Sequence, residues 1–230
     1  MYKPASMTDQ QAMPPPAKLR PQLSPDLVVE AAAKVLERDG FDGLTMRAVA
    51  AELKVQAPAL YWHFPNKDAL QVALFDHLMA DLVFAIDGRD WREDIHRMCH
   101  QLRRHLLARR DSAQLLPHGF FVGPNMMEQA ETILGILIRA GMAPKDAAYA
   151  MSTGVTYIIT WVIGEADVLQ RRLTGHDGND ELAHRLVATG RYPYFAQAIG
   201  AFELGGDIEG QFDFGLNCLI AGFEQLIPRR

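Results

Sequence analysis

Residues 44–67, with the sequence LTMRAVAAELKVQAPALYWHFPNK, constrain the fold of this chain more than any other stretch. Their pattern predicts two short helices, at residues 46–53 and 57–63, joined by a tight turn. Thr45 is a typical N-cap residue for the first helix, and Pro58 stands early in the second, where proline is tolerated. Helices this short are unstable alone in water. We therefore expect neighbouring helices to hold the pair and to offer its aromatic tip to a partner, which we take to be DNA.

Helical spacing of apolar residues continues on both sides of this stretch. Ser24 and Pro25 form a typical helix start, and Gly40 ends the helix that follows them. A further helix is expected to start near Lys67, to run through Ala80 or beyond, and to connect two domains. No strand-like alternation is present. The remaining helices are predicted at residues 91–109, 126–140, 145–169, 181–188, 194–202 and 208–227, with a mobile loop at residues 174–180.

The predicted fold is therefore all-α, with three parts. Residues 1–22 contain consecutive prolines and no periodic pattern, which predicts a disordered N-terminal tail. An alternative is an arm whose few cations enter a DNA minor groove. Residues 23–68 are predicted to form a three-helix helix-turn-helix DNA-binding domain, and residues 69–230 a larger helical domain for ligand binding and dimerisation.

The composition excludes several classes of protein. The chain of 230 residues is 49% apolar and 22% charged, which is ordinary for a globular protein. It has no run near ~18 uninterrupted apolar residues and no apolar block at its N-terminus, so we expect neither a membrane span nor a signal peptide. Cys99 and Cys218 are isolated and suit a reducing compartment. We therefore expect a cytoplasmic protein.

The formal net charge of −5 is unevenly distributed. Residues 1–70 carry 8 basic and 8 acidic residues, whereas residues 71–230 carry 15 basic and 20 acidic residues. A neutral N-terminal part can still present a basic face to DNA, but a large basic arm that coats DNA without specificity is not supported.

Residues 24–78 resemble the N-terminal domain of tetracycline-repressor-type transcriptional regulators. The segments that carry the resemblance are AAAKVLERDGFDGLTMRAVAAEL and VQAPALYWHFPNKDAL. A looser likeness to the tetracycline-repressor subclass covers most of residues 91–227, through GMAPKDAAYAMS and LIAGFEQLI. The resemblance implies a homodimer whose two heads read the halves of a palindromic operator, and a small-molecule effector that releases it.

The candidate DNA-binding residues have two roles. Those placed to reach base edges are Arg47, Gln56, Ala57, Pro58 and Ala59. Those with donors placed for phosphates are Thr45, Tyr61, His63 and Lys67. The resemblance implies DNA contacts for Thr45, Arg47, Gln56, Pro58, Tyr61, Trp62 and Lys67. In the alternative interpretation, the aromatic side chains only pack the small domain, and these are Tyr61, Trp62 and His63.

The larger domain is expected to hold an effector and to dimerise. The helices at residues 145–169 and 208–227 have few charges in their interiors, which predicts a four-helix bundle made by two chains. The alternative is a monomer in which these helices are central. Apolar residues with a few polar anchors would line an effector pocket for a largely apolar or aromatic ligand, and the candidates are Met98, Leu102, His118, Phe120, Phe121, Met126, Met127, Thr153, Tyr157 and Trp161.

The sequence argues against a magnesium–tetracycline effector. The residues that stand where the resemblance would require polar ligands are Val83, Met98 and Leu116, and Glu165 alone falls at a matching acidic position. His96 and His100 have a workable spacing for two metal ligands on a helix. No Cys or acid is spaced along the sequence to complete a tetrahedral site, although Glu93 is close. A pH-responsive or ligand-contacting role, and a solvated or structural one, remain open for them. We predict no metal and no cofactor.

Three functional classes remain to be separated. The first is a ligand-responsive repressor. The second is a helical small-molecule binding protein or an enzyme without a DNA role, and the third is a structural DNA-binding protein without a ligand. No nucleophile motif, Gly-rich phosphate loop or HExxH pattern is present, so we do not expect an enzyme.

Overall fold

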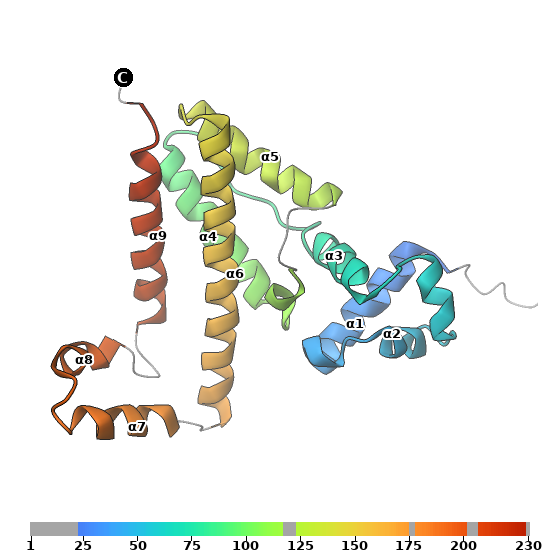
Figure 1. Ribbon diagram of the computed structural model, residues 1–230. Coiled ribbons are helices and arrows are strands. Elements are labelled where there is room, and N and C mark those ends of the chain that lie inside the picture. The colour runs from blue at the N-terminus through green and yellow to red at the C-terminus, as the bar shows by residue number, and fades with distance from the viewer. Residues whose placement is uncertain (1–22, 117–122, 175–177, 202–206, 229–230) are drawn as a thin grey trace, which may run out of the picture.

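The computed structural model describes residues 23–116, 123–174, 178–201 and 207–228. Every regular element in these ranges is helical, which confirms the all-α prediction. The chain folds into a small N-terminal head and a larger body (Figure 1). The head comprises α1 (Pro25–Gly43), α2 (Met46–Glu52), the 3₁₀ helix η1 (Ala57–Trp62) and α3 (Lys67–Leu78). The body comprises α4 (Trp91–Leu107), η2 (Ser112–Leu115), α5 (Pro124–Arg139), α6 (Pro144–Thr174), α7 (Gly178–Val187), α8 (Pro193–Ala198), η3 (Ile199–Ala201) and α9 (Ile208–Glu224).

Side-chain caps start the helices of the head, as the sequence predicts. Ser24 Oγ accepts from the amide of Leu27 at 3.3 Å, and Thr45 Oγ1 accepts from the amide of Ala48 at 3.1 Å. Gly40 has φ +75° and breaks the regular geometry of α1, although the helix resumes as far as Gly43. The fully buried side chains that join α1, α2 and η1 include those of Val28, Val35, Leu44, Val49 and Leu60.

The expected end of the connecting helix and the expected extent of one loop were wrong. The helix that connects the domains ends at Leu78, because the chain turns there to bury Met79 and Leu82, which are 3% and 6% exposed. The expected loop at residues 174–180 is shorter, since α6 extends to Thr174 and α7 begins at Gly178. The recognition helix expected at residues 57–63 is present at Ala57–Trp62 as a 3₁₀ segment, a form common in short pieces. The tail at residues 1–22 lies outside the described residues.

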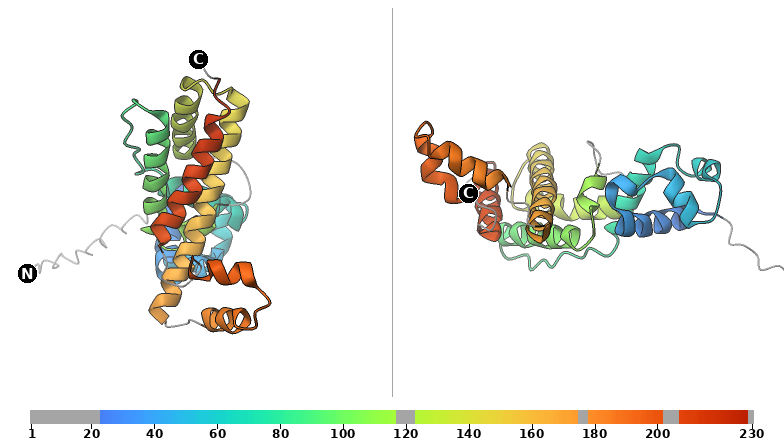
Figure 2. Two further views of the ribbon diagram at one scale, coloured as in Figure 1. Left: turned by 90° about the vertical axis from the view of Figure 1, so that its left-hand side faces the viewer. Right: turned by 90° about the horizontal axis from the view of Figure 1, so that it is seen from below.

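In the body, α6 packs against α4 and α5 on one side and runs beside α9 on another, while α7 and α8 lie beyond one end of this pair (Figures 1 and 2). The helix α6 is long and apolar enough to span a membrane by length and composition, and 22% of its most apolar stretch is buried within the chain. Part of the apolar surface of α6 is therefore exposed to solvent in a single chain.

Two carboxylates are among the groups that join the head to the body. From α3, the buried carboxylate of Asp76 accepts from the amide of Met126 at 2.8 Å and from Asn125 Nδ2 at 3.0 Å, so it caps the start of α5. From the body, Asp111 Oδ2 accepts from the amide of Phe41 at 3.0 Å, beside the end of α1. These contacts link the start of α5 and the start of η2 directly to the head.

Candidate DNA-binding surface and effector site

At the tip of the head, two aromatic side chains are exposed to solvent and are not packed in the core. Leu60 is 0% exposed and Phe64 is 8% exposed, so these two residues anchor η1. Tyr61 and Trp62, which lie between them, are 52% and 90% exposed. The interpretation in which Trp62 packs the small domain is therefore wrong. The exposed indole and phenol are available to a partner.

Donors for phosphate surround this tip. Because Thr45 Oγ1 accepts from a backbone amide, its hydroxyl proton remains free to donate. Asn66 caps α3 by accepting from the amide of Ala69 at 2.8 Å, and Lys67 follows it at the helix N-terminus. The Lys67 ammonium lies 4.8 Å from the centroid of the Phe41 ring, which holds the charge at this end of the head.

All ten predicted DNA-binding residues belong to α2, η1, α3 or their caps. The exposed members are Thr45, Arg47, Gln56, Pro58, Tyr61 and Trp62, and the half-buried members are Ala57, Ala59, His63 and Lys67. Within the described part of the chain, no carboxylate forms an ion pair with Arg47, whereas Arg38 engages the carboxylates of Asp39 and Glu52 at 2.9 and 2.7 Å. The guanidinium of Arg47 is thus free for a base edge or a phosphate.

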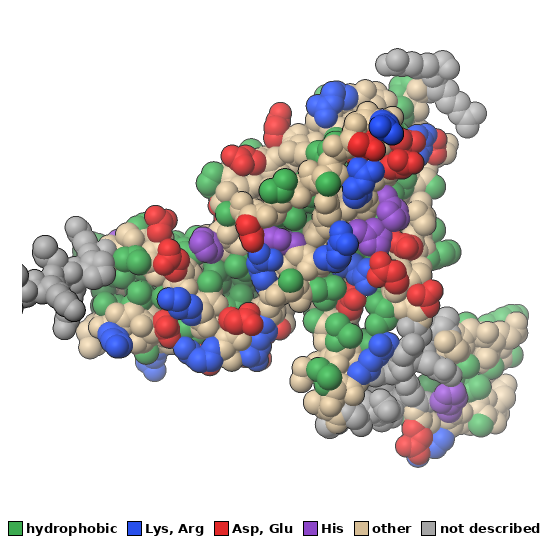
Figure 3. Space-filling view, turned by 180° about the vertical axis from the view of Figure 1, so that it is seen from behind, with side chains coloured by type: hydrophobic (Ala, Val, Ile, Leu, Met, Phe, Trp, Pro, Cys, Tyr) green, Lys and Arg blue, Asp and Glu red, His purple; other side chains and the backbone are tan. Residues whose placement is uncertain are grey.

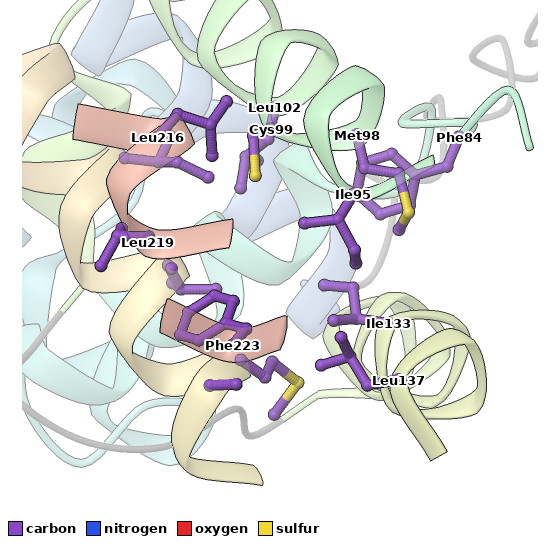
Figure 4. A pocket seen from close by; sticks show the side chains of 15 residues that line it. Phe84, Ile95, Met98, Cys99, Leu102, Ile133, Leu137, Leu216, Leu219 and Phe223 are labelled. Atoms are coloured by element: carbon purple, nitrogen blue, oxygen red, sulfur yellow. The ribbon is translucent and has the colours of Figure 1, made fainter. Parts of the chain in front are cut away.

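The body contains an apolar cavity of about 40 Å³ between α4, α5, α6 and α9 (Figure 4). Met98 and Leu102, which the sequence predicts as pocket residues, line it together. The sequence analysis missed the other walls, which include Phe84, Ile95, Cys99, Ile133, Leu137, Met151, Leu216 and Phe223. Helical periodicity identifies such residues as buried, but it does not distinguish a cavity wall from a packed core.

A second, open hollow of about 510 Å³ lies on α6 and the start of α9. Tyr157 and Trp161 line it. The Tyr157 ring stacks on Phe212 at a centroid distance of 5.5 Å, and the Trp161 ring lies tilted against Phe212 at 5.7 Å. The Tyr157 hydroxyl donates to the carbonyl of Phe212 at 2.7 Å. The Trp161 Nε1–H is buried and has no hydrogen-bond acceptor among the described residues.

The remaining predicted pocket residues lie elsewhere. Met126 is packed at the start of α5 with 2% exposure, and Met127 is 56% exposed. The Thr153 hydroxyl donates to the carbonyl of Tyr149 in its own helix at 2.8 Å. Three predicted residues lie outside the described ranges, namely His118, Phe120 and Phe121. Among the described residues, the structure thus divides the predicted set between the cavity, the hollow, the packed core and the surface.

Two charged arrangements link α4 to other helices. Glu165, the acid at the position expected for a metal-binding group, forms a double hydrogen bond with the buried guanidinium of Arg103. On the neighbouring face, His96 and His100 meet Asp213 of α9, an acid that the sequence analysis missed. The pairing was invisible in the sequence because Asp213 is 113 residues from His100.

Known proteins resemble the chain along most of its length. Residues 28–74 match the family described as "Bacterial regulatory proteins, tetR family", and residues 85–227 match "Tetracyclin repressor-like, C-terminal domain". The chain is 34% identical over 205 residues to the tetracycline repressor protein class A from transposon 1721 of Escherichia coli, which covers 87% of this chain and 90% of that protein.

Two solved structures have the same fold. The Streptomyces coelicolor TetR family protein ActR, in complex with actinorhodin, is 29% identical and superposes with a TM-score of 0.78 over 89% of this chain and 98% of ActR. BioQ with its double-stranded DNA operator is 31% identical, with a TM-score of 0.64 over 88% of this chain and 98% of BioQ. The matched family is one of bacterial regulatory proteins rather than enzymes. The chain belongs to the tetracycline repressor family of bacterial transcriptional regulators.

Proposed function

We propose that this chain is a homodimeric repressor that binds a palindromic operator and is released by a small, largely apolar or aromatic effector. The observation that carries the proposal is the exposure of Trp62 and Tyr61 on η1, while Leu60 of the same helix is fully buried. Together with Arg47 and Lys67, these side chains offer the hydroxyl, ammonium and guanidinium donors that recognise phosphates and base edges. Related proteins with a DNA operator or actinorhodin bound support the same function.

The uncovered faces of α6 and α9 support a dimer. Apolar side chains exposed there include Tyr149, Ile163, Leu169, Leu173 and Phe214. Two helices from each of two chains would bury these faces in a four-helix bundle, and this arrangement gives α6 a cover without a membrane. Light scattering of the full chain is expected to give twice the mass of one chain. Phe214→Arg is expected to shift the mass toward the monomer, and a monomeric wild-type protein would contradict the dimer.

The apolar cavity supports an effector of matching chemistry. Because the cavity holds only about 40 Å³, an effector enters by displacing its walls, and the flexible side chains of Met98 and Met151 allow this. Ile133→Phe fills the cavity from α5 and is expected to weaken effector binding without weakening operator binding. Ile138→Phe, on an exposed position of the same helix, is the matched control. Equal effects of both substitutions would remove the cavity as the effector site.

Gel shifts test the DNA part of the proposal. The full chain is incubated with the DNA that flanks its own gene, with and without candidate apolar ligands. We expect a specific shift that the effector reverses, as for a repressor acting in the cytoplasm. If no specific shift occurs at moderate salt while ligand binding persists, the chain is instead a helical small-molecule binding protein.

A further inference from the structure

Two histidines and a carboxylate converge on the face of the body between α4 and α9. His96 and His100 lie on successive turns of α4, with their ring centroids 4.7 Å apart. Asp213 Oδ1 of α9 is 2.7 Å from His100 Nε2 and 3.5 Å from His96 Nε2. One ligand atom from each residue can be chosen so that all three lie within 4.8 Å of one another. Ligand atoms around a tetrahedral zinc ion lie roughly 3.3 Å apart, so only small side-chain movements separate this cluster from a coordination geometry.

A second carboxylate orients one of the histidines. Glu209, one turn before Asp213 on α9, places Oε1 at 3.3 Å from His100 Nδ1. Arg103 Nη1 donates to the other oxygen of Glu209 at 2.5 Å and so fixes its position. With Nδ1–H directed at a carboxylate, Nε2 carries the lone pair that binds a metal ion, as in the carboxylate–histidine–zinc arrangement, and the ion replaces the contact of Nε2 with Asp213. This contact makes Glu209 a positioning residue rather than a ligand.

The cluster is open to solvent on one side. A hollow of about 570 Å³ is lined by His96 and His100 together with Arg92, Glu93, Arg97 and Asn217. The side chain of His96 is 37% exposed and that of His100 is 17% exposed. Histidine side chains gather on this face of the body beside carboxylates (Figure 3). An ion can therefore enter from water, and water can complete its coordination.

The cations around the hollow are already paired. Arg97 lies 3.0 Å from Asp94 and 3.6 Å from Asp87, and Arg92 pairs with Asp90 and Glu224. Arg103 is held by Glu165 and Glu209. These carboxylates offset the guanidinium charges, so a divalent cation at the cluster does not face unpaired positive charge.

We propose that His96, His100 and Asp213 bind a divalent transition-metal ion of the zinc class, with Glu209 orienting His100. Imidazole and carboxylate ligands suit Zn²⁺, Co²⁺, Ni²⁺ and Cu²⁺ more than Mg²⁺. The ion fastens α4 to α9 on the outside of the body, apart from the apolar cavity. The site goes beyond the proposed repressor function and does not depend on it.

Co²⁺ and Zn²⁺ titrations of untagged, chelator-treated full chain test this site. We expect one Co²⁺ per chain, visible d–d bands of a site with nitrogen and oxygen ligands, and displacement by Zn²⁺. At a hundredfold excess of Zn²⁺ over its Kd, the melting temperature is expected to rise by roughly 5 to 10 °C. A wild-type protein without d–d bands and without this rise would overturn the proposal.

Variants assign the ligands. Glu209→Gln is expected to weaken Co²⁺ binding by roughly 10- to 100-fold while keeping one ion per chain, and His96→Ala and Asp213→Asn are expected to weaken it more. His77→Ala removes an exposed histidine on α3 and is the matched control, expected to bind as the wild type does. Melting curves without metal show whether each variant is folded. His96 is more exposed than His100, so its replacement is expected to disturb folding less. Equal weakening by His77→Ala and His96→Ala would also overturn the proposal.

Discussion

Arg103 of α4 and Glu165 of α6 form a buried ion pair with two parallel hydrogen bonds. Arg103 Nε lies 2.8 Å from Glu165 Oε2, and Nη2 lies 2.8 Å from Oε1. The two side chains are 6% and 9% exposed, and the guanidinium also lies 4.5 Å from the centroid of the Phe212 ring. This pair ties α4 to the helix that we assign to the dimer, and it removes Glu165 from the groups available to a metal ion.

Loss of Glu165 should therefore be costly. Glu165→Ala leaves a buried guanidinium without its main partner, and we expect the free energy of unfolding to fall by about 3 to 5 kcal/mol. Asp167→Ala on the same helix breaks the exposed pair with Arg171, and it should cost no more than about 0.5 kcal/mol. Urea unfolding at one fixed protein concentration measures both. A similar fall in the free energy of unfolding for both variants would show that burial of the Arg103–Glu165 pair adds nothing to stability.

Lys67 should contribute to operator binding through charge alone. Its ammonium lies at the N-terminus of α3 and is placed for a phosphate, so Lys67→Ala is expected to weaken binding to all sequences alike and to lower the slope of log affinity against log salt by about 1. Lys145→Ala, at the start of α6 in the body, is the control and should leave the slope unchanged. An unchanged slope in Lys67→Ala would remove this residue from the DNA contacts.

The sequence predicted the head better than the body, for a physical reason. Ser24, Thr45 and Asn66 cap helices through contacts within three residues, and such local contacts can be recognised in a sequence. The end of α3 depends instead on the burial of Met79 and Leu82 against the body. The cavity walls come from four helices, and the histidine cluster needs α9 beside α4. These features arise from tertiary packing, which local periodicity does not specify.

Acid should destabilise the protein through His105. Burial lowers the pKa of His105, and Arg109 acts in the same direction, although the bond from Nε2 to the carbonyl of Leu78 at 2.7 Å and the charge of Asp81 oppose them. The folded state therefore binds a proton less readily than the unfolded state, whose His pKa is near 6.5. The stability from neutral His105 is complete above that pKa and is lost as the pH falls through the lower folded value.

His105→Gln, which keeps a donor near the carbonyl of Leu78, isolates this effect. We expect the wild type to lose more unfolding free energy than the variant between about pH 7.5 and pH 5. Urea unfolding at both pH values measures the difference, and the other histidines cancel because both proteins contain them. An equal loss in the two proteins would exclude His105 as the source.

The contact between Asp111 and Phe41 should control how firmly the head is held. Asp111 Oδ2 accepts from the amide of Phe41, and Arg110 Nη1 donates to the carbonyl of Arg38 at 2.7 Å. Gly40 lies beneath them with φ +75°, and a Cβ there would come within 2.7 Å of Asp111 Oδ2. Both the conformation and the close approach at this position require glycine.

Asp111→Ala leaves the amide of Phe41 without its acceptor, which costs about 1 to 3 kcal/mol and corresponds to a roughly 5- to 150-fold rise in local opening. Hydrogen exchange should therefore accelerate by this factor at residues 37–44 and less at residues 46–52 of α2. Gln114→Ala is the control, because its amide donates to Asp111 Oδ1 at 3.2 Å within η2 without touching the head. If the two variants exchange alike at residues 37–44, the carboxylate of Asp111 does not fasten the head to the body.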